Sequence, residues 1–190
     1  KALSLIDIEE PTIKMTFMLN DSPFAGKEGK FSTARQLRQR LFKELETDVA
    51  LKIEETAEGD WIVSGRGELH LSILIENMRR EGYELEVSKP QVIFKEENGK
   101  KLEPIELVSI EVPEKFSGSA IEMMGKRLGL MKDMRVDRGQ VFMDFAVPTR
   151  GLIGFRNEFL TNTKGLGIMN SIFLGYEEYR GDLNANQHGS

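Results

Sequence analysis

The sequence of 190 residues contains no cysteine and only two histidines. The absence of cysteine excludes disulfides, thiol catalysis and thiolate metal sites. His70 and His188 are far apart in the sequence, so only carboxylate metal sites remain, and no calcium-binding loop motif is present. The lack of cysteine fits a reducing compartment, and we expect a cytoplasmic location. No apolar run approaches the roughly 18 residues of a membrane span, so we expect no membrane partner.

The sequence motifs of common enzymes are also missing. Gly26-Lys27 and Gly29-Lys30 resemble part of a phosphate-binding loop, but the full pattern is matched nowhere. The pair Gly65 and Gly67 lacks the third glycine of the dinucleotide fingerprint, because position 70 is histidine. We expect His70 to be a packed or hydrogen-bonding residue. We therefore predict no catalytic residues, no metal, no cofactor and no small-molecule substrate for this chain.

Length and charge set two further limits. The chain is 39% hydrophobic and 30% charged, which is typical of globular proteins, and its length suits two small domains. It begins with Lys1 and has neither an initiator methionine nor the apolar core of a signal peptide, so we expect a piece of a longer protein. The net charge of -5 argues against a general nucleic-acid binder. Any surface for RNA must therefore be a local basic patch.

The stretch from residue 65 to residue 82 shows how the chain is organised. A β-branched and aromatic segment, residues 61–63, precedes it, and residues 83–87 alternate with the period of a strand. Between them, one helical face is apolar, with Leu71, Leu74, Ile75 and Met78. Gly82 stands where a helix usually ends. The pattern predicts strand, glycine turn, amphipathic helix and strand.

The same order of elements is predicted twice. In the first half, strands are expected over residues 12–20 and 49–55, with a helix between them that begins after Ser32 or Thr33. In the second half, a strand over 106–113, a helix over 116–129 with Ile121, Met124 and Leu128 on one face, a hairpin over 131–147, a helix over 149–164 and a strand over 168–176 follow. The order β-α-β-β-α-β is that of the ferredoxin-like unit.

We therefore predict an α+β fold of two ferredoxin-like domains, each an antiparallel sheet with its helices on one face. The first domain is expected over residues 1–94 and the second over residues 105–181. Residues 95–104 are polar, with Asn98-Gly99 and Pro104 as breakers, and are expected to be a linker. Residues 182–190 are expected to be a tail or the start of a further domain.

Three groups of cations stand out as binding surfaces. The first lies between Lys27 and Lys43, with Phe24 and Phe31 interleaved. The second comprises Lys126, Arg127, Lys132, Arg135 and Arg138, and the third Arg150, Arg156 and Lys164. Such groups neutralise phosphates, and aromatic rings stack on bases. Each group alone is also compatible with a solvated helix face, so the pattern favours RNA without establishing it.

Several motifs resemble a known family. The run Gly65-Arg66-Gly67-Glu68-Leu69-His70-Leu71, followed by residues 87–92, resembles the third domain of elongation factor G-type translational GTPases. Residues 22–31 and 35–41 are similar to the TypA/BipA branch of that family. So are Pro148-Thr149-Arg150-Gly151-Leu152-Ile153-Gly154-Phe155-Arg156 and residues 161–165. The resemblance covers essentially the whole chain.

The resemblance implies a fold, a parent activity and a partner. It implies that the two units are the third and fifth domains of a ribosome-associated GTPase, linked to ribosome assembly and to stress or low-temperature adaptation. GTP and magnesium would belong to a nucleotide-binding domain that this chain does not contain, so we expect no nucleotide here. The implied partners are ribosomal RNA and ribosomal proteins. The candidate contacts with ribosomal RNA are Lys27, Lys30, Arg35, Arg38, Lys126, Arg127, Arg150 and Arg156.

Two other functions remain open on the sequence. One is a self-associating ferredoxin-like module that regulates or binds a small ligand through its sheet faces. The other is an enzyme with carboxylate chemistry, which the lack of any acid–base constellation disfavours.

Overall fold

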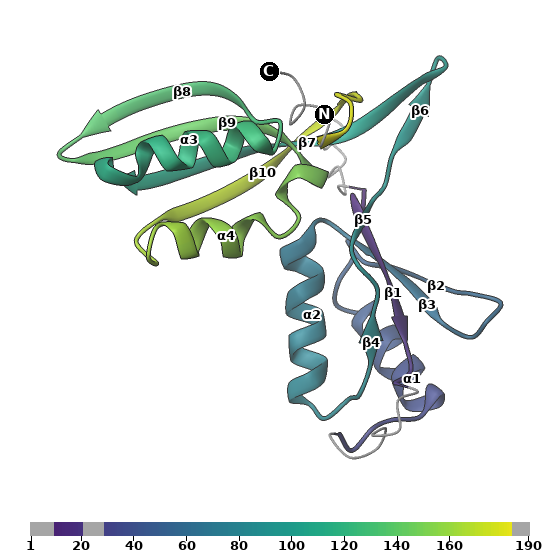
Figure 1. The fold of residues 1–190 in the computed structure, drawn as a ribbon. Helices are drawn as coiled ribbons and strands as arrows, with labels where there is room; N and C mark the ends of the chain where they lie inside the picture. The colour runs from purple at the N-terminus through teal and green to yellow at the C-terminus, as the bar shows by residue number, and fades with distance from the viewer. Residues whose placement is uncertain (1–9, 21–28, 184–190) are drawn as a thin grey trace, which may run out of the picture. The chain divides into compact units, whose positions relative to one another are not determined.

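The computed structural model describes residues 10–20 and 29–183, and the chain divides into two compact units, residues 1–93 and 94–190 (Figure 1). Each unit combines antiparallel strands with two α-helices, so the chain has the predicted α+β class with ferredoxin-like units. No helix among the described residues is long and apolar enough to cross a membrane.

The first unit follows the predicted order of elements. The elements are β1 (Ile13–Met18), α1 (Ala34–Glu44), β2 (Lys52–Glu55), β3 (Trp61–Gly65), α2 (Glu68–Arg80), β4 (Glu86–Val87) and β5 (Gln91–Val92). The strands pair antiparallel in the order β2-β3-β1-β4, and β5 also pairs with β1.

The core of the first unit forms where the apolar face of its strands packs against the apolar faces of its two helices. Period two along β1 buries Ile13, Met15 and Phe17, and Phe17 lies opposite buried Trp61 on β3. The helix α2 buries the four residues that its apolar face predicts, and α1 adds Leu37 and Leu41.

The start of α1 and the end of α2 follow from the residues at those positions. Thr33 and Gln36 form a capping box at α1, and Gly82, with φ of 101°, follows the end of α2.

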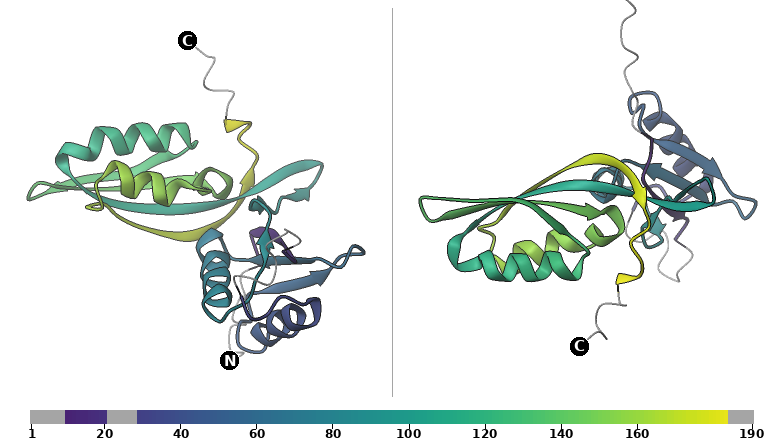
Figure 2. Two further views of the ribbon diagram at one scale, coloured as in Figure 1. Left: turned by 60° about the horizontal axis from the view of Figure 1, so that its bottom comes forward. Right: turned by 90° about the horizontal axis from the view of Figure 1, so that it is seen from above.

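The second unit also contains a five-stranded sheet and two α-helices. The elements are β6 (Lys95–Glu97), β7 (Lys100–Pro113), a 3-10 turn η1 (Glu114–Phe116), α3 (Ser117–Lys126), β8 (Leu130–Asp137), β9 (Gln140–Pro148), a 3-10 turn η2 (Thr149–Leu152), α4 (Phe155–Asn162) and β10 (Ile168–Glu178). The strand order is β10-β7-β9-β8, with β6 paired to β7. Both α-helices lie on one face of that sheet (Figure 2).

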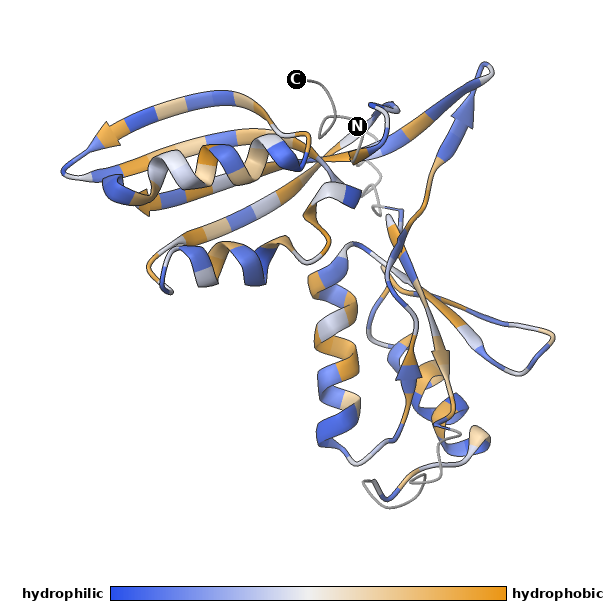
Figure 3. Cartoon of the chain, viewed as in Figure 1, coloured by the Kyte–Doolittle hydropathy of each residue, from blue (hydrophilic) through white to orange (hydrophobic). Residues whose placement is uncertain are grey.

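Alternation along the strands decides which side chains face these helices. Hydrophobic and hydrophilic residues alternate along the strands of this sheet (Figure 3). Val108, Ile110 and Val112 of β7 are buried in one cluster with Phe155 and Phe159 of α4. The intervening residues of each strand point to the opposite face, which carries no helix (Figure 2).

Residues 95–104, predicted as a linker, are instead part of the second unit. They form β6 and the first residues of β7, joined by a two-residue turn at Asn98 and Gly99. Both turn residues have positive φ, 54° and 76°, which is the conformation that tight hairpins favour. Asn-Gly therefore acts here as a hairpin turn and not as a break between domains.

Two helix predictions in the second unit differ from the structure. The apolar face of α3 is Ala120, Met123 and Met124, whereas Ile121 is 38% exposed. The single helix predicted over residues 149–164 is divided, because Gly154 takes a left-handed conformation with φ of 74° between η2 and α4. Burial of Leu152, Phe155 and Phe159 nevertheless agrees with the predicted apolar spacing.

Candidate nucleic-acid interface

Two cations of the first group are exposed at the start of α1. Lys30 precedes this helix and Arg35 lies in its first turn, and neither has an ion-pair partner among the described residues. The rings of Phe31 and Tyr83 lie against each other with their centroids 4.7 Å apart and their planes tilted by 30°. This end of the unit offers cations for phosphates close to aromatic surface. Lys27, predicted to belong to the same group, lies outside the described residues.

The next two arginines of α1 are engaged with carboxylates. Arg38 pairs with Glu55 at 2.9 Å, although its side chain is still 55% exposed, and its guanidinium lies 4.9 Å from the centre of the Phe42 ring. Arg40 is bound more tightly, by Glu81 at 2.6 Å and Glu44 at 2.8 Å. The hydrogen bond with Arg40 holds the pKa of Glu81 below its ordinary value. Arg38 is therefore partly available to a ligand, and Arg40 is a structural residue.

The second group contains two adjacent cations with different surroundings. Lys126 is 64% exposed and makes only a 3.5 Å surface pair with Glu122. Arg127 instead donates to the carbonyl oxygens of Gly151 and Ile153, at 3.1 and 2.8 Å, and to Glu158 at 2.6 Å. The other predicted cations of this group, Lys132, Arg135 and Arg138, lie on β8 or in the turn after it and are exposed.

The close approach between Arg127 and η2 requires glycine at position 151. A Cβ atom on Gly151 would lie 2.4 Å from the carbonyl oxygen of Arg127, and backbone cannot move aside easily. Packing inside the second unit therefore explains why the motif Pro148 to Arg156 contains this glycine. The same packing gives Arg127 a structural role.

Of the predicted contacts, Arg150 is the one held most firmly by groups inside the second unit. Its guanidinium donates to the carboxylate of Glu103, whose side chain is fully buried, and to the carbonyl oxygen of Gly181. It also lies 4.4 Å from the centre of the Tyr179 ring. Glu103 accepts a further hydrogen bond, 2.9 Å long, from the backbone N–H of Arg180. The Glu103–Arg150 pair therefore fastens the segment after β10 to the start of β7.

Arg180 reinforces the same connection. Its guanidinium donates to the carbonyl oxygens of Leu128 and Ala146, at 3.0 and 3.2 Å, and to Glu177 at 3.0 Å. Sequence reasoning missed both Glu103 and Arg180. The available signal was weak: Glu103 is a single acidic residue between the apolar residues Leu102 and Pro104-Ile105.

The third group adds two cations near α4. Arg156 lies in the first turn of α4, half-buried and without an ion-pair partner among the described residues. Lys164 follows the helix and is exposed.

The seven described candidates fall into three classes. The charged groups of Lys30, Arg35, Lys126 and Arg156 are available to a ligand, and that of Arg38 is available in part. The guanidinium groups of Arg127 and Arg150 are held inside the second unit.

His70 has the hydrogen-bonding role expected of it. Its Nε2 lies 2.5 Å from the carboxylate of Asp48, and its Nδ1 accepts from the backbone N–H of Arg66 at 3.1 Å. These bonds tie the first turn of α2 to the segment before β2. Over the described ranges, 10–20 and 29–183, no three acidic or histidine side chains are grouped as a metal ion requires.

Comparison with known proteins agrees with the sequence motifs. Residues 28–89 match elongation factor G, domain III, and residues 100–187 match the elongation factor G C-terminus. Over the whole chain, 54% of residues are identical to the large ribosomal subunit assembly factor BipA of Synechocystis. The identity is 58% over 92% of the chain with BipA of Bacillus subtilis, and 52% over the whole chain with BipA of Salmonella typhimurium. The chain spans about a third of the length of these relatives, 32%, 29% and 32%.

A solved structure supports the fold at lower sequence similarity. The crystal structure of the protein ttk003000868 from Thermus thermophilus is 16% identical, with a TM-score of 0.57, and the match covers 95% of this chain and 44% of that one. At that identity the likeness concerns the fold alone. The two domain matches and the BipA relatives are more specific. The chain therefore belongs to the elongation factor G-like family, and within it is similar over its whole length to the BipA factors.

Proposed function

We propose that this chain is a ribosome-binding, non-catalytic portion of an assembly factor for the large ribosomal subunit. The relatives that it matches are named for that assembly role, and the matched domains are domain III and the C-terminus of elongation factor G. The longer protein would be a cytoplasmic GTPase that acts in stress or low-temperature adaptation. Its GTP and magnesium would be bound by a domain other than the two described here.

The observation that carries the RNA contact is the set of cations that the fold leaves available. Lys30 and Arg35 in the first unit, and Lys126 and Arg156 in the second, have no strong internal partner among the described residues. Each unit therefore offers at least two cations to phosphates, although the chain as a whole carries a charge of -5. Lys27 and Arg38 extend the first pair.

Arg127 and Arg150 contribute differently in this proposal. Their guanidinium groups already donate to buried carbonyl and carboxylate oxygens. A phosphate would have to compete with those oxygens, so we assign these two arginines mainly to shaping the surface that presents Arg156. Ribosomal proteins are a second class of partner in this proposal.

Co-sedimentation of the chain with purified ribosomes over a series of salt concentrations tests the proposal. Release of counterions gives a slope of about -0.7 to -0.9 in log affinity against log salt for each phosphate neutralised. Four contacts predict a slope of roughly -3. Binding that does not change with salt, or no binding at low salt, would contradict direct contact with ribosomal RNA through these residues.

A further inference from the structure

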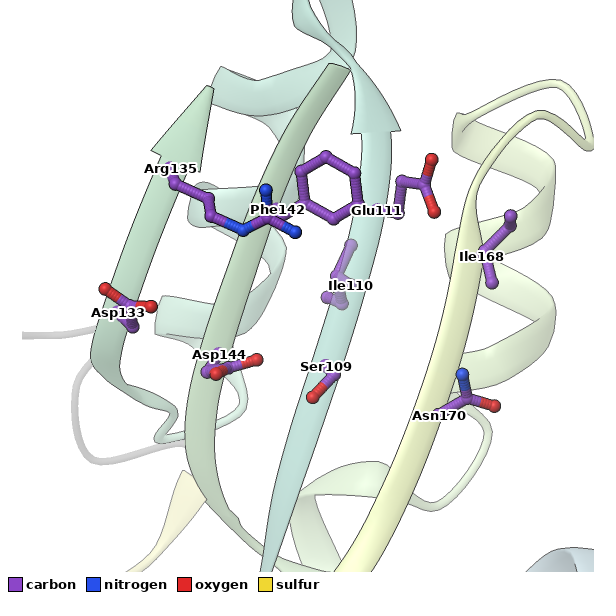
Figure 4. A pocket seen from close by; sticks show the side chains of 9 residues that line it. All are labelled: Ser109, Ile110, Glu111, Asp133, Arg135, Phe142, Asp144, Ile168 and Asn170. Atoms are coloured by element: carbon purple, nitrogen blue, oxygen red, sulfur yellow. The ribbon is translucent and has the colours of Figure 1, made fainter. Parts of the chain in front are cut away.

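The face of the second sheet that carries no helix has a hollow with an acidic lining. Residues from four neighbouring strands surround it, and its volume is about 250 Å³ (Figure 4). Its charged side chains are the carboxylates of Glu111, Asp133 and Asp144 and one guanidinium, that of Arg135. Ser109 and Asn170 add neutral polar groups. With three acids against one base, the hollow attracts cations and repels phosphates.

The single arginine does not neutralise these carboxylates. Arg135 reaches across to Phe142, and its guanidinium lies 4.0 Å from the centre of that ring (Figure 4). No ion pair joins it to an acid in the part of the chain that the structure describes. Asp133 and Asp144, meanwhile, are directly opposite each other on β8 and β9. Like charges at such a cross-strand pair destabilise a sheet, so a bound cation would relieve a repulsion built into the face.

The register places an apolar row next to the acidic row. Asn170, Ser109, Asp144 and Asp133 lie across the four strands. The next row on this face is Ile172, Leu107, Ala146 and Leu130, which are two residues further along each strand except β8, where a register shift makes the step three residues. Ile172 is 61% exposed and Leu130 52% exposed. Adjacent same-face rows are about 7 Å apart, which is also the distance between side chains i and i+2 of an extended peptide. One extended segment can therefore place a cation and an apolar side chain on the two rows together.

We propose that this face docks a basic protein segment, in which an arginine or lysine enters the hollow between Asp133 and Asp144 while an apolar residue two positions away covers Ile172 or Leu130. The occupant follows from charge: a phosphate backbone would meet three carboxylates, whereas a guanidinium gains charge-assisted hydrogen bonds from them. The inference does not depend on the RNA contacts proposed above, which concern other residues.

Fluorescence anisotropy with labelled peptides tests the proposal on the intact chain. The probe is an extended peptide of sequence Leu-Ser-Arg-Ser-Leu-Ser-Arg, in which arginine and leucine stand two residues apart. One matched peptide replaces arginine by glutamine, and another replaces leucine by serine. We expect both replacements to weaken binding, and a decauridylate oligonucleotide not to compete. Binding that depends on arginine alone, or that the oligonucleotide displaces, would overturn the proposal.

Variants locate the binding on this face. Asp133→Asn with Asp144→Asn should weaken the probe by roughly fivefold or more, since hydrogen bonds to charged groups exceed those to neutral ones. The matched control neutralises two exposed acids of the same unit on β6, with Glu96→Gln and Glu97→Gln, and should leave affinity within about twofold. The aspartate variant should also unfold at a higher temperature without peptide, because the cross-strand repulsion is gone. Equal affinities for the two double variants would refute the assignment.

Discussion

The buried carboxylate of Glu103 gives the sharpest prediction about stability. It has no solvent-exposed side-chain surface, and it accepts hydrogen bonds from Arg150 and from the backbone N–H of Arg180. In Glu103→Gln, the side-chain volume stays nearly the same, but the negative charge that balances Arg150 is lost. The amide also brings a donor to a place where two donors already point. We therefore expect the second unit to be destabilised strongly.

The magnitude follows from burial. Breaking a buried ion pair by removing one partner costs about 3–5 kcal/mol, and the retained carbonyl oxygen of glutamine favours the lower end. For a unit of this size, about 3 kcal/mol corresponds to a fall in melting temperature of at least roughly 12 °C. The matched control is Glu177→Gln. This change removes a pair with Arg180 in which Glu177 is 54% exposed, and it should cost at most about 1 kcal/mol.

Thermal unfolding followed by two probes locates the effect. The one tryptophan in the sequence, Trp61, is buried in the first unit, so its fluorescence reports on that unit, whereas circular dichroism reports on both. Glu103→Gln should lower the transition seen by circular dichroism and leave the transition of Trp61 in place. A loss below about 1 kcal/mol, equal to that of Glu177→Gln, would refute the view that this pair fastens the segment after β10.

Three further changes test the packing of the two units. Gly151→Ala should destabilise the second unit by about 1–3 kcal/mol in urea unfolding, because the new methyl group meets the Arg127 carbonyl; an unchanged midpoint would contradict that contact. Thr33→Ala should cost about 1 kcal/mol by the same assay, through loss of the capping box, while Ser32→Ala should be neutral. Burial raises the pKa of Glu106, which the neighbouring hydroxyls of Thr149 and Ser171 offset only in part. Stability is therefore expected to fall as pH rises from the ordinary carboxyl range through the raised pKa, and Glu106→Gln should abolish that fall in melting scans; a parallel pH profile for the variant would exclude Glu106 as its cause.

Periodicity predicted most of the fold, because the relevant signals are local. The alternation in β1 and the i, i+3, i+4, i+7 pattern in α2 each depend on one element and one buried face. The start of α1 was predicted at Ser32 or Thr33, and the end of α2 at Gly82. These features need no knowledge of distant residues.

Ambiguous local signals led to the errors. Asn98-Gly99 is compatible with both a linker and a hairpin, and only pairing with residues 100–102 decides between them. Gly154 sits in an apolar helical pattern and nevertheless takes a left-handed conformation that divides the helix. In both places, the backbone conformation of one or two residues decided the structure, and the sequence pattern around them did not reveal it.

The candidate site was harder to predict, since a cation in a sequence does not reveal its partner. Lys30 and Arg150 look alike in a list of basic residues. One is exposed, and the other is held by a carboxylate 47 positions earlier in the chain. The resemblance to translational GTPases implied a ribosomal partner, but it could not separate surface cations from structural ones. The fold supplies that distinction.

Charge reversal at the available cations tests whether they contact the ribosome. Lys30→Glu with Arg35→Glu, and separately Lys126→Glu with Arg156→Glu, are compared with Lys52→Glu and Lys89→Glu, two exposed lysines outside the three groups. All variants are first shown to melt like the parent chain, and are then sedimented with ribosomes at one low salt concentration. We expect the first two pairs to lose ribosome binding and the third pair to retain most of it. Equal binding by all three variants would contradict the claim that these cations contact the ribosome.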